Sequence, residues 1–233
     1  MTANLNLATL TLMQGFYING TLNSGSGTSV AGAGDVNNDG YDDIIIGAPW
    51  ASSNAGEFYV VYGSASINDI NLATLTSVQG FSISGLSGDY YANPAAGAGD
   101  VNNDGYADFI INAGISYVIY GKDFPEDIDL SILTSAQGFS ISASNFYISS
   151  VAGAGDVNND GYDDVIIGAP NANNYAGASY VIYGGTLLKN IDVTSSLTSV
   201  QGFSISGSST DIYFGYSVSG LEMSIKTDMT ILL

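Results

Sequence analysis

The sequence predicts an all-β fold, and three observations carry that prediction. The 233 residues include 30 glycines and 16 tyrosines, and such a mixture of aromatic and turn-forming residues favours strands joined by tight turns. Short apolar runs such as IIIG (44–47) have no helical period, and no stretch combines that period with helix caps. The same order of segments also recurs along the chain, with Gln-Gly-Phe at Gln14, Gln79, Gln137 and Gln201.

Each repeat of roughly 60 residues contains four segments that we expect to form strands. A small-residue segment, SVAGAG in repeats one and three, suits a strand whose backbone approaches another closely. The apolar run lacks alternation, which is typical of a strand covered on both faces. A tyrosine-rich segment (FYVVYG or SYVIYG) and the alternating GFSIS segment complete the set.

Repeated four-stranded units of this length are typical of propeller blades. The sequence therefore predicts a partial β-propeller of about three and a half four-stranded blades, truncated at both ends. The loop-bearing repeats are expected at approximately 14–78, 79–136 and 137–200, with an incomplete fourth repeat at 201–233.

The fourth repeat begins with FGYSVSG (214–220) and then departs into LEMSIKTDMTILL (221–233). Codons for that tail can be chosen so that another reading frame restores an acidic loop. We therefore hypothesise a frameshifted fourth loop, the alternative being a divergent terminal repeat.

Composition excludes several classes of function. The formal net charge is −19, with 22 acidic residues against three basic ones, so clustered cations for nucleic acid or an anionic membrane are missing. The absence of His and Cys removes zinc sites, disulfides and imidazole-based catalysis. No apolar run approaches the ~20 residues of a membrane span, and the N-terminus lacks the basic start of a signal peptide.

Half of the acidic residues lie in three copies of one loop, D-x-N-x-D-G-x-x-D. Oxygen-bearing side chains at positions 1, 3, 5 and 9 can converge on one point, with glycine at position 6 permitting the turn. The carbonyl at position 7 is the further ligand expected by analogy with an EF-hand loop. Oxygen-only ligation favours Ca²⁺ over Mg²⁺, so about three Ca²⁺ sites are predicted. The predicted ligands are Asp35, Asn37, Asp39, Tyr41 and Asp43; Asp100, Asn102, Asp104, Tyr106 and Asp108; and Asp156, Asn158, Asp160, Tyr162 and Asp164.

Electrostatics supports this interpretation over a plain turn rich in Asn, Asp and Gly. Two carboxylates 4 Å apart repel by about 4 kcal/mol at an effective dielectric of 20. The second loop has Ala107 where the others have Asp42 and Asp163, and this position is not a predicted ligand.

These residues resemble the FG-GAP repeat of integrin alpha-subunit propellers and related bacterial surface proteins. The resemblance rests on FGYSV (214–218) and on AGAGDVNNDGYDDIIIGAP in the intact units. It implies propeller blades, usually seven to a ring, with Ca²⁺ held between the first two strands of a blade. The second unit departs from the pattern, with Asn112-Ala113-Gly114 in place of GAP.

The expected function is a noncatalytic, calcium-binding extracellular or cell-surface module for adhesion or for recognition of a protein or glycan. Further repeats or another copy of the chain are expected partners, and nucleic acid is not. One alternative is a propeller hydrolase that uses two carboxylates; another is a structural spacer in a large surface protein. For the hydrolase, the remaining acids include Glu57, Asp69, Asp89, Glu126, Asp127, Asp129, Asp192 and Asp211. DYY (89–91) and NFY (145–147) are candidates for an exposed recognition surface.

Overall fold

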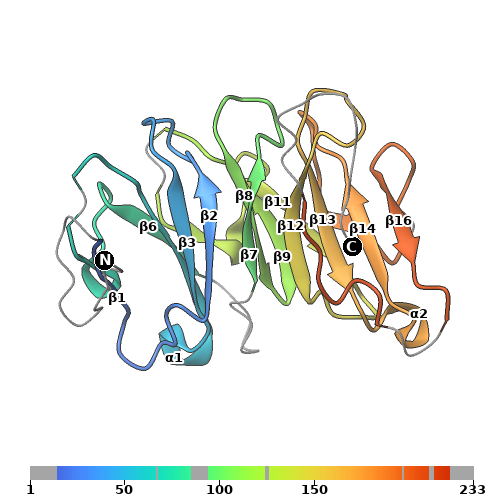
Figure 1. Ribbon diagram of the computed structural model, residues 1–233, viewed down its shortest axis with the longest axis horizontal. Helices are drawn as coiled ribbons and strands as arrows, with labels where there is room; N and C mark the ends of the chain where they lie inside the picture. Colours follow the sequence, from blue (N-terminus) through green and yellow to red (C-terminus); the bar gives the residue numbers. More distant parts are fainter. Residues whose placement is uncertain are drawn as a thin grey trace, which may run out of the picture.

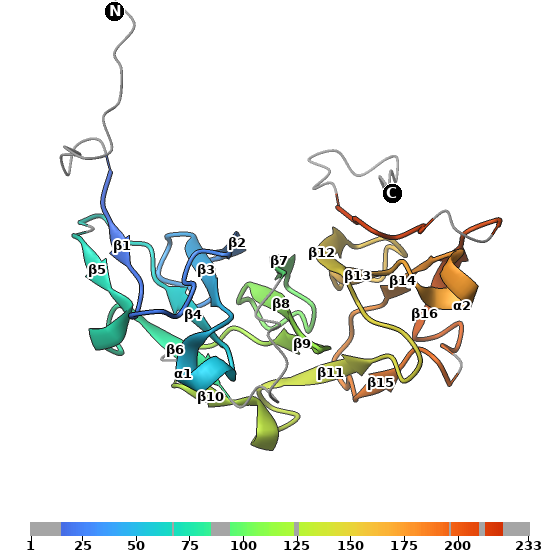
Figure 2. The same cartoon turned by 90° about the horizontal axis from the view of Figure 1, so that it is seen from below.

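The computed structural model describes residues 15–66, 68–84, 94–123, 126–195, 197–209 and 213–220. Within these ranges, three main β-sheets stand side by side in an open arc (Figure 1). The all-β fold predicted from the sequence is confirmed, and each sheet has the strand order of a propeller blade. Figure 2 shows that β2, β7 and β12 lie on the inner side of the arc.

The three blades repeat one strand order from the inner to the outer side of the arc. The first contains β2 (Ser29–Gly34), β3 (Asp43–Ala48), β4 (Glu57–Val61) and β6 (Gly80–Ser84). The second contains β7 (Ala95–Gly99), β8 (Asp108–Ala113), β9 (Ile115–Ile119) and β11 (Gly138–Ser142). The third contains β12 (Ser150–Gly155), β13 (Asp164–Ala169), β14 (Ala178–Ile182) and β16 (Gly202–Ser206).

The blades and the sequence repeats are out of phase by one strand. The GFSIS segment near the start of each later repeat is the outer strand of the preceding blade, antiparallel to its tyrosine-rich strand. The GFSIS strand of each later repeat therefore belongs to the preceding blade, and the other strands of that repeat form the next blade.

Short parallel strands fasten neighbouring units together, a feature that the sequence did not predict. The strands β5 (Ile70–Asn71), β10 (Ile128–Asp129) and β15 (Ile191–Asp192) pair with β1 (Ile18–Asn19), β6 and β11, respectively. The residue before each short strand adds a side-chain hydrogen bond. Backbone N–H groups donate to it in three pairs: Tyr17 to Asp69 (2.9 Å), Ser82 to Asp127 (2.7 Å) and Ser140 to Asn190 (2.9 Å).

The glutamine of the QGF motif holds the turn that precedes the outer strand. The Oε1 atoms of Gln79, Gln137 and Gln201 accept hydrogen bonds from the hydroxyls of Thr76, Thr134 and Thr198 at 2.7–2.8 Å. Short 3₁₀ turns, η2 (Leu72–Thr74) and η3 (Leu130–Ile132), lead into two of these segments. Because the glutamine side chain closes the turn directly before the outer strand, the motif marks where that strand begins.

The apolar runs form strands that are buried on both faces, as predicted. Successive residues of a strand point to opposite faces, and in the second blade Ile110 packs toward the third blade while Ile111 packs toward the first. Both side chains are fully buried. The lack of alternation in these runs therefore reflects a sheet between two neighbouring sheets.

The inner strands approach each other so closely that only glycine fits at one position. A Cβ at Gly153 would lie 2.7 Å from the carbonyl oxygen of Gly97, and a Cβ at Gly220 would lie 1.9 Å from that of Gly153. A Cβ at Gly32, the same position in the first blade, would meet no atom within 4 Å. Phe214 also forms a bridge with Gly177. The start of the fourth repeat therefore packs on the third blade, whereas residues 221–233, and the frameshift hypothesis with them, lie outside the described residues.

This contrast predicts different effects for one substitution at two equivalent sites. Gly153→Ala forces a methyl group against the backbone of the second blade and should lower the free energy of unfolding by about 1–3 kcal/mol. Gly32→Ala should change it by less than about 1 kcal/mol, because the added methyl group meets open space. Urea denaturation of both variants measures the difference. Equal losses would contradict the close packing of the inner strands.

Candidate metal sites

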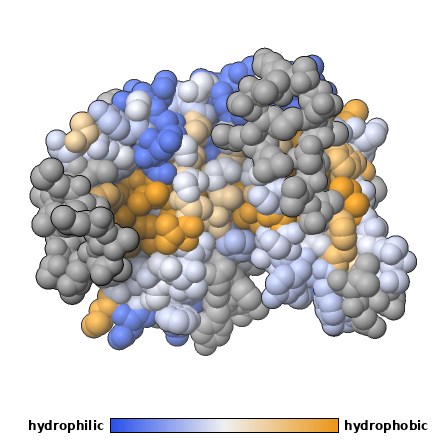
Figure 3. Space-filling model, in the orientation of Figure 1, coloured by the Kyte–Doolittle hydropathy of each residue, from blue (hydrophilic) through white to orange (hydrophobic). Residues whose placement is uncertain are grey.

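The three acidic loops lie along one edge of the arc, where each joins the two innermost strands of a blade. They connect β2 to β3, β7 to β8 and β12 to β13, and they project at the top of Figure 1. Figure 3 shows hydrophilic surface along the same edge. Each inner strand ends in a bulge just before its loop, at Gly34, Gly99 or Gly155, which have φ of 77°, 77° and 68°. This left-handed conformation favours glycine, and it explains the second glycine of the AGAGD motif.

The side chains at positions 1, 3 and 5 share a small network of hydrogen bonds. In the first loop the N–H of Asp39 donates to Asp35 Oδ1 (3.0 Å) and to Asn37 Oδ1 (3.1 Å), so these two oxygens face one point. The N–H of Gly40 donates to Asp35 Oδ2 at 2.8 Å, and that of Tyr41 to Asp39 Oδ1 at 3.0 Å. The other two loops repeat all of these contacts within 0.2 Å.

Position 4 has a role that the sequence analysis did not assign. Asn38, Asn103 and Asn159 have φ of 57°, 56° and 60°. Asparagine tolerates this left-handed region better than other residues with a side chain. Asparagine recurs at position 4 of all three loops, where no ligand is predicted, and this recurrence was the sequence signal for a left-handed residue.

The aspartate at position 9 is buried and ties three segments together. Asp43 is 1% exposed, and Asp108 and Asp164 are fully buried. In the second loop Asp108 Oδ2 accepts from the N–H of Val101 (2.9 Å), and Oδ1 accepts from the N–H of Gly121 (2.8 Å), beyond the tyrosine-rich strand. Asp43 and Asp164 make the same two contacts. One carboxylate therefore holds the loop, its own strand and the next strand in register.

Burial raises the pKa of all three position-9 carboxyls. The pKa of Asp43 is raised to about 6, that of Asp108 to about 8 and that of Asp164 to about 7, mainly by desolvation. The two backbone N–H groups oppose the rise, and the nearby carboxylates at positions 5 and 1 add to it. Each loop therefore holds negative charge close to a buried carboxyl, where a cation is favourable.

Neighbouring loops are also joined to one another through position 8. The N–H of Ala107 donates to the carbonyl of Asp35, and the N–H of Asp163 donates to that of Asp100, both at 3.1 Å. The carboxylate of Asp163 in addition accepts from the N–H of Asp100 at 2.8 Å. The residues at position 8 thus connect neighbouring blades, and the carboxylate of Asp163 has a partner outside its own loop.

The structure brings the predicted side chains of each loop near each other without forming a complete metal centre. Among the residues that it describes, no three or more His, Cys, Asp or Glu side chains are gathered closely enough to hold an ion. The donors nevertheless fit Ca²⁺ in chemistry, because all are oxygens. Each oxygen of Asp108 accepts one N–H, and a carboxylate offers about four acceptor positions, so acceptor capacity remains for a cation.

Most of the other acids weighed for a hydrolase have structural partners. Asp69 and Asp127 accept backbone N–H groups at the short parallel strands. Asp129 and Asp192 cap turns through Ser131 and Thr194, and these hydrogen bonds lower the pKa of both carboxyls. Asp89, Asp211 and the DYY segment lie outside the described residues. In the NFY segment, Phe146 stacks on Tyr180, whereas Tyr147 is 54% exposed.

The fold and its loops define a class, an open arc of propeller blades with an acidic loop in each. The family model of the FG-GAP repeat matches residues 26–61 and 147–182, which cover most of the first and third blades. Two of its blades therefore match the FG-GAP repeat, and the resemblance seen in its motifs is confirmed.

Curated relatives agree with this assignment. The chain is 33% identical to integrin alpha pat-2 of Caenorhabditis elegans over 178 residues, which are 64% of this chain and 14% of the relative. It is 26% identical to phosphatidylinositol-glycan-specific phospholipase D of Bos taurus over 222 residues, 83% of this chain and 24% of the relative. For integrin alpha-6 of Gallus gallus the identity is 25% over 140 residues, 58% and 12% of the two chains. The chain thus spans less than a quarter of the length of each of these relatives.

The two kinds of loop aspartate should respond differently to substitution in the presence of a chelator. Asp108→Ala leaves the N–H groups of Val101 and Gly121 buried without an acceptor and should cost about 2–5 kcal/mol of stability. Asp104→Ala removes an exposed acceptor and should cost less than about 1 kcal/mol under the same conditions. Denaturation in EDTA measures both, and a loss from Asp104→Ala as large as that from Asp108→Ala would contradict the assigned roles.

Proposed function

We propose that this protein is a noncatalytic calcium-binding module that acts outside the cell or on its surface in adhesion or in recognition of a protein or glycan. The observation that carries the proposal is the threefold repetition of one loop geometry, with oxygen donors at positions 1, 3, 5 and 9. The predicted side-chain ligands are Asp35, Asn37, Asp39 and Asp43 and their equivalents in the other two loops. The carbonyls of Tyr41, Tyr106 and Tyr162 are the proposed position-7 ligands.

Bound Ca²⁺ would supply positive charge that offsets the carboxylates of each loop. The loop residues then perform the structural work. The position-9 aspartate fixes the loop to two strands, and position 8 fixes it to the neighbouring loop. A rigid row of loops along one edge would hold the blades at a constant spacing, so that loops elsewhere can form a recognition surface.

The location follows from the expected affinity. Extracellular Ca²⁺ modules bind at roughly 10⁻⁴–10⁻³ M, a concentration found outside cells and not in the cytosol. Protein ligands are further supported by relatives named integrin alpha. None of the described residues forms a helix long and apolar enough to cross a membrane.

The phospholipase D relative does not change the proposal. The activity in its name belongs to that protein, of which this chain covers 24%. Most of the remaining described acids accept hydrogen bonds in turns or beside the short parallel strands. This supports a binding role over a carboxylate hydrolase.

Calcium should raise the melting temperature, and EDTA should reverse the rise. Mg²⁺ should have a smaller effect, because it demands stricter geometry. Asp39→Ala, Asp104→Ala and Asp160→Ala should each remove part of the rise, and the triple variant should remove nearly all of it. Calorimetry with each ion provides the measurement. A melting temperature indifferent to chelator would refute calcium binding.

A further inference from the structure

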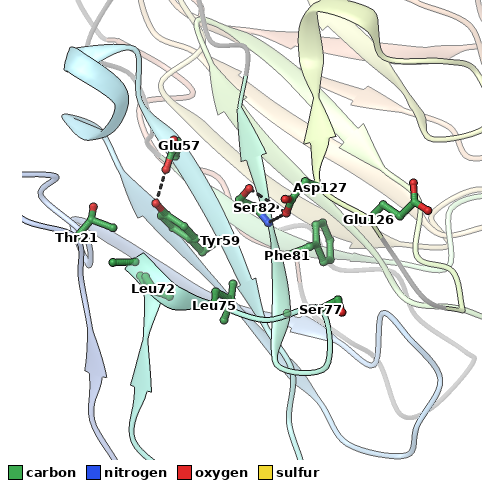
Figure 4. A pocket seen from close by; sticks show the side chains of 12 residues that line it. Thr21, Glu57, Tyr59, Leu72, Leu75, Ser77, Phe81, Ser82, Glu126 and Asp127 are labelled. Atoms are coloured by element: carbon green, nitrogen blue, oxygen red, sulfur yellow. Dashed lines mark hydrogen bonds between the residues drawn. The ribbon is translucent and has the colours of Figure 1, made fainter.

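Two adjoining hollows lie on the outer half of the first blade, away from the acidic loops. One has a volume of about 590 Å³ and the other of about 490 Å³, and both are lined by Thr21, Glu57 and Tyr59. We call the pair the outer groove. Volumes of this size fall in the range of small-molecule sites. Figure 4 shows the larger hollow, with Glu57 and Tyr59 on one side and Phe81 and Asp127 on the other.

Trp50 forms an exposed aromatic surface at one end of the outer groove. It lines the smaller hollow and is 50% exposed, and it is the single tryptophan of the chain. Its backbone N–H donates to the backbone carbonyl of Ser24 at 2.8 Å, which positions the main chain at this residue. A Cβ at Gly25 would lie 2.5 Å from a carbon of the indole, so the ring rests against this backbone. The ring therefore packs against Gly25 on one side, and because the residue is half exposed, an apolar ligand face can stack on it.

A chain of hydrogen bonds between neutral and acidic side chains forms the middle of the groove. The hydroxyl of Tyr59 donates to Glu57 Oε2, and the hydroxyl of Ser52 donates to Glu57 Oε1. The side chain of Thr21 also hydrogen-bonds to Tyr59. At the far end, Asp127 Oδ1 accepts from both the N–H and the hydroxyl of Ser82, at 2.7 and 3.0 Å. The carboxylates are thus oriented before any ligand arrives.

The backbone beside Trp50 contains several residues in the left-handed region. Four residues that line the smaller hollow have left-handed φ: Asn23 (57°), Ser52 (48°), Ser53 (60°) and Asn54 (71°). The last three belong to α1 (Ala51–Asn54). Such residues cost roughly 1–3 kcal/mol each and cluster at functional sites. The third blade has the same kind of turn, with left-handed φ at Asn173 (52°), Asn174 (55°) and Tyr175 (65°), so Trp50, and not the backbone, distinguishes the turn of the first blade.

The chemistry of the lining distinguishes classes of ligand. No Lys or Arg lines either hollow, and Glu57, Glu126 and Asp127 do, so anionic ligands are disfavoured. Neutral donors hold Glu57 and Asp127 and leave their negative charge in place, so a basic peptide is the competing class of ligand, which oligolysine tests below. An uncharged sugar chain matches the set better, since its apolar ring face can stack on an indole while its hydroxyls bind amides and carboxylates.

From these contacts we propose that the outer groove binds a neutral oligosaccharide, with one sugar ring stacked on Trp50 and others along Glu57 and Tyr59. This assignment deepens the recognition part of the proposed function by naming a ligand class, and it does not depend on calcium in the loops. In the third blade Asn171 occupies the position of Trp50, in the turn α2 (Ala172–Tyr175). The site is therefore a property of the first blade.

Trp50 fluorescence reports directly on the site, because no other tryptophan contributes. The full chain, in calcium, is titrated with cello-, chito-, malto- and manno-oligosaccharides of about four to six units. At least one series should change the emission in a saturable and salt-insensitive manner. In calorimetry, Trp50→Ala should weaken that binding at least about tenfold. Tyr175→Ala, which removes a similarly exposed ring from the third blade, should leave it unchanged. Glu57→Gln should weaken it only a few-fold.

Other outcomes would overturn the assignment in distinguishable ways. Binding of oligolysine in place of every sugar, abolished by salt and by Glu57→Gln, would refute the sugar and leave a recognition function standing. No response to any sugar or to oligolysine would refute the groove as a recognition site. The calcium-dependent melting temperature, measured on the same samples, tests the loops separately, so failure of one proposal is not failure of the other.

Discussion

The buried aspartate at the end of each acidic loop is the contact on which the rest of the structure depends. Its two oxygens accept N–H groups from the start of the loop and from the end of the tyrosine-rich strand. Those segments are 7 and 13 residues away in the second blade and up to 20 in the others. One carboxylate therefore aligns the loop, its own strand and the following strand, and the loop that it closes carries the predicted calcium ligands.

Neighbouring blades contact each other differently at the inner, middle and outer strands. The inner strands contact each other through the backbone at glycine. The middle strands pack through apolar side chains on both faces, and each outer strand pairs with a two-residue parallel strand of the next unit. Each layer repeats along the arc, as expected of an architecture in which every unit contacts mainly its neighbours. Val30 of the first blade is 60% exposed, whereas its equivalent Val151 is 5% exposed, because among the described residues no full blade precedes the first.

Local patterns predicted the strands and the loop, and long-range contacts account for what was missed. The apolar runs, the GFSIS segments and the DxNxDG turn are signals within a few residues, and all appear where expected. The hydrogen bond between Ser82 and Asp127 joins residues 45 apart in the sequence, and no local pattern predicts it. The second role of Asp43, as a buried anchor, required knowledge of Gly63. Trp50 carried no pattern at all, since its importance comes from resting on Gly25 beside a hollow.

The central claim, that each acidic loop holds one Ca²⁺, is tested most directly by a crystal structure of the protein grown in calcium. We expect three ions, one in each loop, with the oxygens of positions 1, 3, 5, 7 and 9 at about 2.3–2.6 Å from the metal. The position-9 carboxylate should keep its two backbone N–H partners in that structure. Loops without density for an ion at saturating calcium, and with side chains arranged as they are here, would contradict it.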